Sequence, residues 1–186
     1  MAASQIWIAL FRGINVGGHA PLPMKTLPAL MEKCGCREAR TYIQSGNVVF
    51  RSSVKSAETL ATRIGKAVLA AHKHEPRVYL LTQKEFAKAV AANPYKKAAE
   101  EHPQYLHLFF LDGKPGKPGK PDLEKLESLK TNGEEFTLKG NVFYLHTPNG
   151  FGTSKLAARA MSGLSVDGTA RNMRTCKTLV ELAAEL

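Results

Sequence analysis

The sequence contains the same pattern of residues twice, and this internal repeat constrains the fold more than any other feature. Three short segments of the first half match the second half at offsets of 94, 96 and 93 residues: Gly46–Phe50 with Gly140–Tyr144, Leu60–Arg63 with Leu156–Arg159, and Thr82–Lys84 with Thr175–Lys177. Chance agreement between common residue types is the alternative explanation. Because the order of the predicted elements also agrees, we expect a duplication, with one unit at 1–92 and a second at 93–186.

Runs of apolar and β-branched residues predict four strands in each half. In the first half these runs lie at 6–11, 41–44, 48–50 and 77–81. In the second half they lie at 106–111, 136–138, 142–145 and 166–171. The second and third strands of each half flank a short turn containing Gly46 or Gly140, which predicts a hairpin in both halves.

Helices are predicted between these strands by apolar residues at helical spacing and by residues that favour helix ends. The first should begin at residue 25 or 26, because Pro28 is tolerated only in a first turn, and should end at Gly35. Capping side chains predict four others, which start after Ser56, after Thr82, after Thr153 or Ser154, and after Thr175. An apolar stripe predicts one more, through Leu123–Leu129. Each half thus has the order βαββαβ plus one helix, so we predict the fold class α+β, with two ferredoxin-like units and antiparallel sheets.

The charge of the chain is concentrated in its first half. The 186 residues carry 26 Lys and Arg against 16 Asp and Glu, a formal net charge of +10. Residues 1–92 hold 13 basic and 5 acidic side chains, which leaves +8, whereas residues 93–186 hold 13 and 11, which leaves +2. A basic excess raises the local concentration of anions, including nucleic acid and phosphorylated small molecules, but it also serves simply to keep a surface solvated.

The sequence disfavours several classes of protein. No apolar run approaches the ~20 residues of a membrane span, and the first residues lack the basic start and apolar stretch of a secretion signal. Three cysteines, an odd number, suit a reducing compartment, so we expect a cytoplasmic protein without membrane contact. No motif for a catalytic nucleophile occurs. A metal site is not indicated, because Cys34-Gly35-Cys36 lacks a second cysteine pair, and the spacing of the Gly-rich loops does not match a dinucleotide-binding motif. We therefore predict no metal and no cofactor, and an enzymatic role is disfavoured without being excluded.

Two clusters in the first half are candidate sites for an anionic ligand. The loop after the first strand combines successive glycines, whose amides can cradle an anion, with flanking basic side chains, and its candidates are Arg12, Gly13, Asn15, Gly17, Gly18 and Lys25. The hairpin turn adds Tyr42, Gln44, Ser45 and Asn47, and alternation along a strand would place Tyr42 and Gln44 on one face. The alternatives are a glycine-rich connection that needs positive φ angles and ordinary turn chemistry.

Two further clusters lie in the second half. Ser154 and Lys155 stand at an expected helix start, where hydroxyl and ammonium groups can hold a phosphate or carboxylate. Arg171 and Asn172 precede the last helix, and the Arg171 guanidinium could fork onto an anion. The alternatives are ordinary helix capping and a structural contact from Asn172 to the backbone. His146 shares a strand face with Tyr144 and is interpreted as a structural histidine rather than a catalytic one.

The motifs also resemble a known family. The segments Phe11–Gly18, Arg40–Phe50, Asn93–Tyr95, Ser154–Leu156 and Thr169–Asn172 are similar to those of the bacterial family called domain of unknown function 1697, and the resemblance runs from about Ile6 to Leu182. The resemblance implies a pair of ferredoxin-like units, in agreement with the repeat. It implies no catalytic residues, because the family has no established activity.

Three functions remain open from the sequence. The first is a binding module for an anionic ligand, either nucleic acid or a phosphorylated small molecule, held at loops between the two units. The second is a small enzyme with a cleft between the units, since catalytic groups often lie on loops. The third is a structural or oligomerising protein, because an open sheet face can pair with another. The sequence does not define the oligomeric state.

Overall fold

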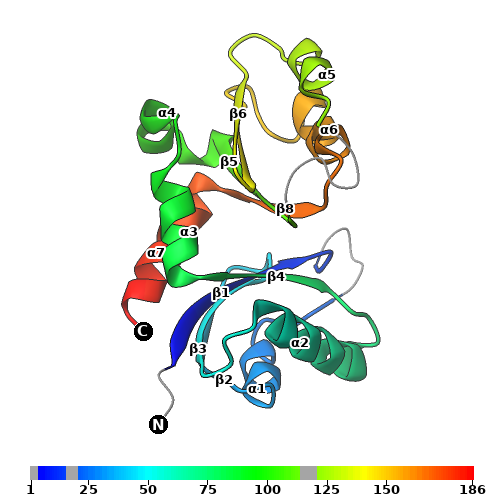
Figure 1. The fold of residues 1–186 in the computed structure, drawn as a ribbon, viewed down its shortest axis with the longest axis vertical. Helices are drawn as coiled ribbons and strands as arrows, with labels where there is room; N and C mark the ends of the chain where they lie inside the picture. Colours follow the sequence, from blue (N-terminus) through cyan, green and yellow to red (C-terminus); the bar gives the residue numbers. More distant parts are fainter. Residues whose placement is uncertain (1–3, 16–20, 114–120) are drawn as a thin grey trace. The chain divides into compact units, whose positions relative to one another are not determined.

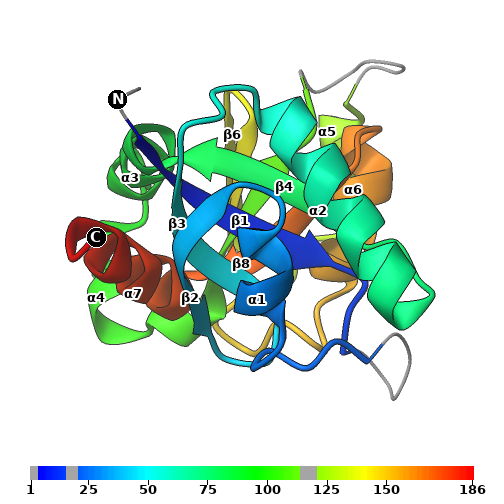
Figure 2. The ribbon, with the colours of Figure 1, turned by 90° about the horizontal axis from the view of Figure 1, so that it is seen from below.

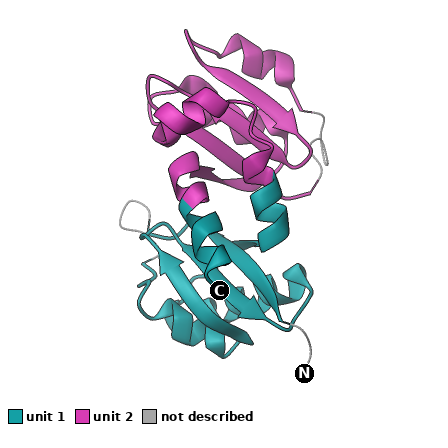
Figure 3. Cartoon of the chain, turned by 90° about the vertical axis from the view of Figure 1, so that its left-hand side faces the viewer, with its two compact units in different colours: residues 1–88, 178–186 teal, residues 89–177 magenta. Residues whose placement is uncertain are grey.

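A computed structural model describes residues 4–15, 21–113 and 121–186 of the chain. It divides into two compact units, unit 1 with residues 1–88 and 178–186 and unit 2 with residues 89–177 (Figure 3). The division differs from the contiguous halves 1–92 and 93–186 because it falls inside two helices, α3 (Gln83–Ala91) and α7 (Met173–Ala184). The C-terminal part of α7, from Thr178 onward, belongs to unit 1, where Gln83 Nε2 donates to the Ala183 carbonyl at 2.9 Å.

Unit 1 is a four-stranded antiparallel sheet with two helices on one face (Figures 1 and 2). Its elements in chain order are β1 (Gln5–Arg12), α1 (Leu27–Glu32), β2 (Cys36–Tyr42), β3 (Asn47–Ser52), α2 (Ala57–His72) and β4 (Arg77–Thr82). The strand order is β2-β3-β1-β4. This order and the βαββαβ sequence of elements are those of a ferredoxin-like unit.

Unit 2 repeats the same topology. Its elements are β5 (Leu106–Leu111), α5 (Leu123–Ser128), β6 (Glu135–Lys139), β7 (Val142–His146), α6 (Lys155–Leu164) and β8 (Gly168–Asn172), with the strand order β6-β7-β5-β8. The predicted fold class, α+β with two ferredoxin-like units, is confirmed. The sequence did not predict the helix α4 (Lys96–Glu101) or the short 3-10 turn η1 (Pro103–Tyr105), which precede β5.

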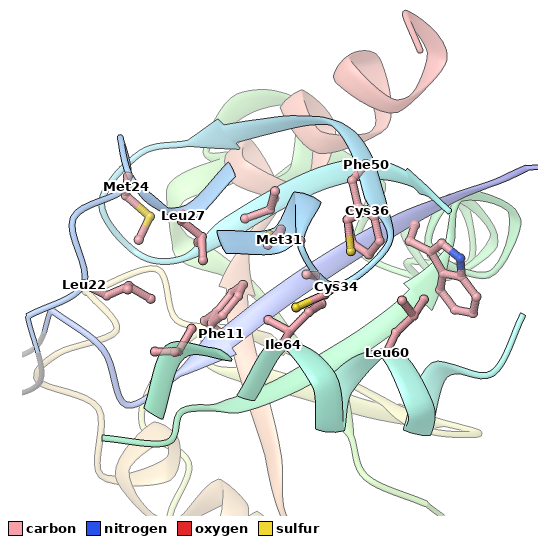
Figure 4. Close-up of a cluster of buried hydrophobic side chains, with 14 of the residues drawn as sticks. Phe11, Leu22, Met24, Leu27, Met31, Cys34, Cys36, Phe50, Leu60 and Ile64 are labelled. Atoms are coloured by element: carbon pink, nitrogen blue, oxygen red, sulfur yellow. The ribbon is translucent and has the colours of Figure 1, made fainter. Parts of the chain in front are cut away.

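The core of unit 1 lies between its sheet and its two helices (Figure 4). Alternate residues of β1, namely Trp7, Ala9 and Phe11, pack there against residues of α1 and α2 such as Met31 and Ile64. The intervening residues Ile8 and Leu10 are also buried. Both faces of β1 are therefore covered, which explains its continuous apolar run instead of an alternation.

Several predicted helix ends agree with the structure, but two do not, the first of them being α1, which ends at Glu32 with Lys33 as its cap and so stops before Gly35. Ser56 Oγ accepts from the Thr59 amide at 3.1 Å, and the Thr82 hydroxyl accepts from the Glu85 amide at 3.2 Å, as capping residues do. Thr175 does not cap the last helix, because α7 begins at Met173 and a capping residue stands before the first helical residue. Within the part of the chain that the structure describes, none of the helices combines the length and the apolar composition that crossing a membrane requires.

Candidate functional site

The structure brings the first two predicted clusters together in unit 1. Asn15 Nδ2 donates to the carbonyl oxygens of Leu22 (3.0 Å) and Gln44 (2.9 Å), and its Oδ1 accepts from the Leu22 amide (2.8 Å). The Phe11 amide donates to the Gly46 carbonyl at 2.8 Å. The side chain of Asn15 therefore ties the loop after β1 to the turn between β2 and β3.

The backbone of these two segments is held in a left-handed conformation at several positions. The φ angle is 53° at Asn15, 49° at Ile43 and 72° at Gly46. This conformation is sterically unfavourable for a β-branched residue, yet Ile43 adopts it. The Ile43 side chain is also 51% exposed. The prediction that Tyr42 and Gln44 share a strand face is wrong, because β2 ends at Tyr42 and the chain turns at Ile43.

The predicted binding residues of this region differ in accessibility. Asn47 is fully buried, and its Nδ2 donates to the Tyr42 carbonyl (3.2 Å) and to Ser45 Oγ (2.9 Å), so it holds the turn together. Tyr42 is half-buried. The exposed members are Arg12, Gly13, Lys25, Gln44 and Ser45. Gly17 and Gly18 lie outside the described residues.

Two predicted residues of unit 2 act as helix caps. Ser154 Oγ accepts from the Ala157 amide at 3.0 Å and caps α6, which leaves Lys155 exposed as the first helical residue. Asn172 Oδ1 accepts from the Thr175 amide at 2.8 Å. This bond corrects the prediction for the last helix, because Asn172, and not Thr175, supplies the cap. Both side chains thus have the structural partners that the alternative interpretation required.

Arg171 is buried in unit 2. Its Nη1 donates to Thr169 Oγ1 and to the Ala170 carbonyl, both at 2.8 Å. Burial lowers the pKa of Arg171 to about 10. A guanidinium in this environment stays charged at neutral pH, and its neighbouring backbone and hydroxyl groups fix its position.

A pocket of about 550 Å³ lies wholly within unit 2. One wall comes from α4 and the residues around it, and the other from β6 and β7. The titratable side chains that line it are Tyr95, Lys96, Lys97, Glu101, His102, Glu135 and His146. Its volume falls within the range of about 300–1,000 Å³ that small-molecule sites occupy.

The wall that carries Tyr95 is positioned by a buried asparagine. Asn93 is 2% exposed, its Oδ1 accepts from the Tyr95 amide at 3.0 Å, and its Nδ2 donates to the Tyr95 carbonyl at 3.2 Å. The Tyr95 hydroxyl shares a hydrogen bond of 2.8 Å with Thr137 Oγ1 on β6. Both ends of the tyrosine are therefore fixed before any ligand arrives.

The sheet register decides which residues form the opposite wall. Glu135 pairs with His146 across β6 and β7, and the neighbouring residues Phe136 and Leu145 point to the other face and pack in the core with α5 and α6. The segment before β5 is tied to the pocket face, because the Tyr144 hydroxyl donates to the Ala89 carbonyl at 2.7 Å. Lys139 Nζ also donates a hydrogen bond to the Ala92 carbonyl at 3.1 Å, and Lys177 Nζ donates one to the Ala99 carbonyl at 2.7 Å.

The protonation of the pocket follows from its burial. Burial lowers the pKa of His146, and the neighbouring charge of Glu135 opposes that shift. Burial raises the pKa of Tyr95, while its hydrogen bond with Thr137 acts in the opposite direction. At neutral pH the His146 imidazole is therefore mostly neutral and the Tyr95 phenol is protonated. Among residues 4–15, 21–113 and 121–186, no three His, Cys, Asp or Glu side chains are grouped so that they could hold a metal ion.

Sequence reasoning missed this pocket, although two signals pointed toward it. Asn93–Tyr95 was one of the motifs that carried the family resemblance, and the shared face of Tyr144 and His146 follows from strand alternation. The sequence contains no signal for α4, the helix that forms the other wall of the pocket. The stretch 96–101 is Lys-Lys-Ala-Ala-Glu-Glu, which has no apolar stripe to predict a helix.

Two four-stranded antiparallel sheets, each in a βαββαβ unit, define a tandem ferredoxin-like α+β protein. The chain belongs to the family described as Protein of unknown function (DUF1697), whose model matches residues 5–144. The family resemblance seen in the motifs is thus confirmed. The structure described as that of "conserved bacterial protein SP0830 from Streptococcus pneumoniae" is similar, with a TM-score of 0.70 and 20% identity over 97% of this chain and 99% of that chain, which shows a shared fold. No curated protein matches the chain.

Proposed function

We propose that the protein binds a small anionic ligand, of the phosphorylated small-molecule class, in the pocket of unit 2. The observation that carries the proposal is the pocket of about 550 Å³ whose α4 side is lined by Lys96, Lys97 and His102, with Glu101 as the one acidic side chain there. Ammonium and imidazole N–H groups hold phosphate and carboxylate through charge-assisted hydrogen bonds. The predicted location at loops between the two units stays a prediction.

The two lysines keep donors for a ligand. Lys96 Nζ donates to the Ala91 carbonyl at 2.6 Å, which uses one of its three N–H groups. Lys97 is 84% exposed, and its Nζ lies 4.0 Å from Glu101 Oε1. Such an exposed and loose ion pair contributes little free energy, so an entering anion competes with it at small cost.

A nucleic-acid strand is a poorer match than a small molecule. Polymers are held by extended basic grooves that follow many phosphates. The pocket is a local cavity, and it lies in the half of the sequence whose net charge is only +2. Nucleic-acid binding would instead use the first half, whose net charge is +8, and it would weaken steeply as salt is added.

Charge reversal at one lysine tests the proposal. With ribose 5-phosphate as the probe in calorimetric titrations, Lys97→Glu should weaken binding about tenfold or more, because a charge-assisted bond is replaced by repulsion. The matched control is Lys155→Glu, which makes the same charge change at an exposed position outside the pocket lining and should alter affinity by less than about twofold.

The opposite pattern, with Lys155→Glu weakening binding and Lys97→Glu leaving it unchanged, would place the anion at the start of α6 and overturn the proposal. Absence of saturable binding to the unmodified protein would also overturn it.

A further inference from the structure

We infer that the ligand of this pocket carries a flat nitrogen-containing ring at the end opposite its anionic group, as a nucleoside monophosphate does. The inference rests on the proposed function and adds the second half of the ligand together with the side chains that recognise it. Three features of unit 2 support it: two aromatic rings, the separation of charge across the pocket, and the rigidity of one wall.

The rings of Tyr95 and His146 face the same pocket from different elements. Their centroids lie 6.3 Å apart and their planes are inclined by 31°. Non-bonded carbon atoms pack at about 3.5–4.0 Å, so a ring inserted between two others needs about 7 Å. A small shift of the His146 ring, with Tyr95 held in place, would open that space, and a flat ring would then stack on both sides.

Charge is divided between the two walls. The wall on the α4 side carries Lys96, Lys97 and one carboxylate, Glu101, and so keeps a basic excess, whereas the sheet wall carries Glu135 next to His146. A carboxylate accepts hydrogen bonds and repels phosphate, so Glu135 fits a ligand end that has N–H donors and no negative charge. The guanine base is an example, since its edge presents neighbouring N–H groups, while its phosphate would face the lysines.

The tyrosine wall is already in place. Asn93 fixes the backbone of Tyr95 through two hydrogen bonds, and Thr137 fixes its hydroxyl. A ring that is held before binding loses little conformational freedom when a base stacks on it. Tyr95 is therefore suited to be the main stacking surface of the pocket.

Comparison of GMP with ribose 5-phosphate tests the inference, because the second compound keeps a phosphate and a sugar and lacks the base. In calorimetric titrations GMP should bind about tenfold tighter or more, since stacking of its base on an aromatic side chain adds to the affinity. Equal affinities would overturn the ring inference and leave the proposed function standing. Binding of neither compound would overturn both.

Three variants locate the ring. Tyr95→Leu should remove most of the GMP advantage, whereas Tyr95→Phe should keep it, because phenylalanine retains the ring and loses only the hydrogen bond to Thr137. Glu135→Gln should weaken GMP about tenfold and leave ribose 5-phosphate unchanged or slightly tighter. A GMP advantage that survives both Tyr95→Leu and Glu135→Gln would contradict the inference. Thermal unfolding of each variant separates loss of binding from loss of the fold.

Discussion

Replacing Gly46 with alanine is expected to destabilise the protein by about 2–5 kcal/mol. Gly46 has a φ angle of 72°, where an added Cβ costs about 1–2 kcal/mol. That Cβ would also lie 2.5 Å from Ile14 Cδ1 and 2.7 Å from Phe11 Cβ. The Ile14 methyl can rotate, but Phe11 Cβ is fixed to the central strand, so the turn itself must move, and such overpacking costs about 1–3 kcal/mol more.

The control for this prediction is Gly13→Ala in the same unit. Gly13 has a similar φ angle of 77°, and nothing lies within 4 Å of the position that its Cβ would take. Equilibrium unfolding in urea should therefore show a loss of only about 1–2 kcal/mol for this variant. Equal losses for the two variants would mean that the close approach between the two loops of unit 1 is not present in solution.

The second large effect is a loss of stability in acid that depends on His107. This residue lies on β5, its ring stacks on Phe151 with centroids 3.8 Å apart, and its buried Nδ1 has no hydrogen-bond partner among the residues that the structure describes. Burial lowers the pKa of His107 to about 4. In the unfolded chain the pKa is about 6.5, so above that pH both states are neutral and the full stability is present. As the pH falls from about 6.5 to 4, only the unfolded state takes up the proton, and the free energy of unfolding drops by about 3 kcal/mol.

His107→Phe isolates this effect, because it keeps the stacked ring and removes the titrating group. At pH 7 the variant should be at least as stable as the unmodified protein, since a buried polar atom without a partner is lost. Its advantage in unfolding free energy should then grow by about 3 kcal/mol as the pH falls to 4. Carboxylates contribute equally to both proteins, so a constant difference across this range would show that His107 is not buried as described.

Much of the fold could be predicted from the sequence because its signals are local. The apolar run before Arg12, the cap at Ser56 and the matching turns at Gly46 and Gly140 each give one element, and their order gives the topology. The error at Tyr42–Gln44 has a physical cause. Ile43 favours a strand by its own preference, but the packing of Gly46 against Phe11 requires the chain to turn earlier.

The site was less accessible to such reasoning because it depends on contacts between distant segments. Asn47, Ser154 and Asn172 have the residue types of a binding site, yet their side chains hold turns and helix ends. The pocket combines residues near 95–102 with Glu135 and His146, and only the sheet register and the short helix α4 bring them together. Residue types alone do not distinguish a polar group that caps a helix from one that lines a cavity.

The most direct test of the central claim is a titration of the protein with ribose 5-phosphate, followed residue by residue in two-dimensional ¹⁵N–¹H spectra. The account predicts saturable shifts of the backbone amides of residues 95–102, Glu135 and His146, which surround the pocket, with little change at residues 12–15 and 42–47. Saturable shifts confined to residues 12–15 and 42–47, or the absence of any saturable shift, would contradict it.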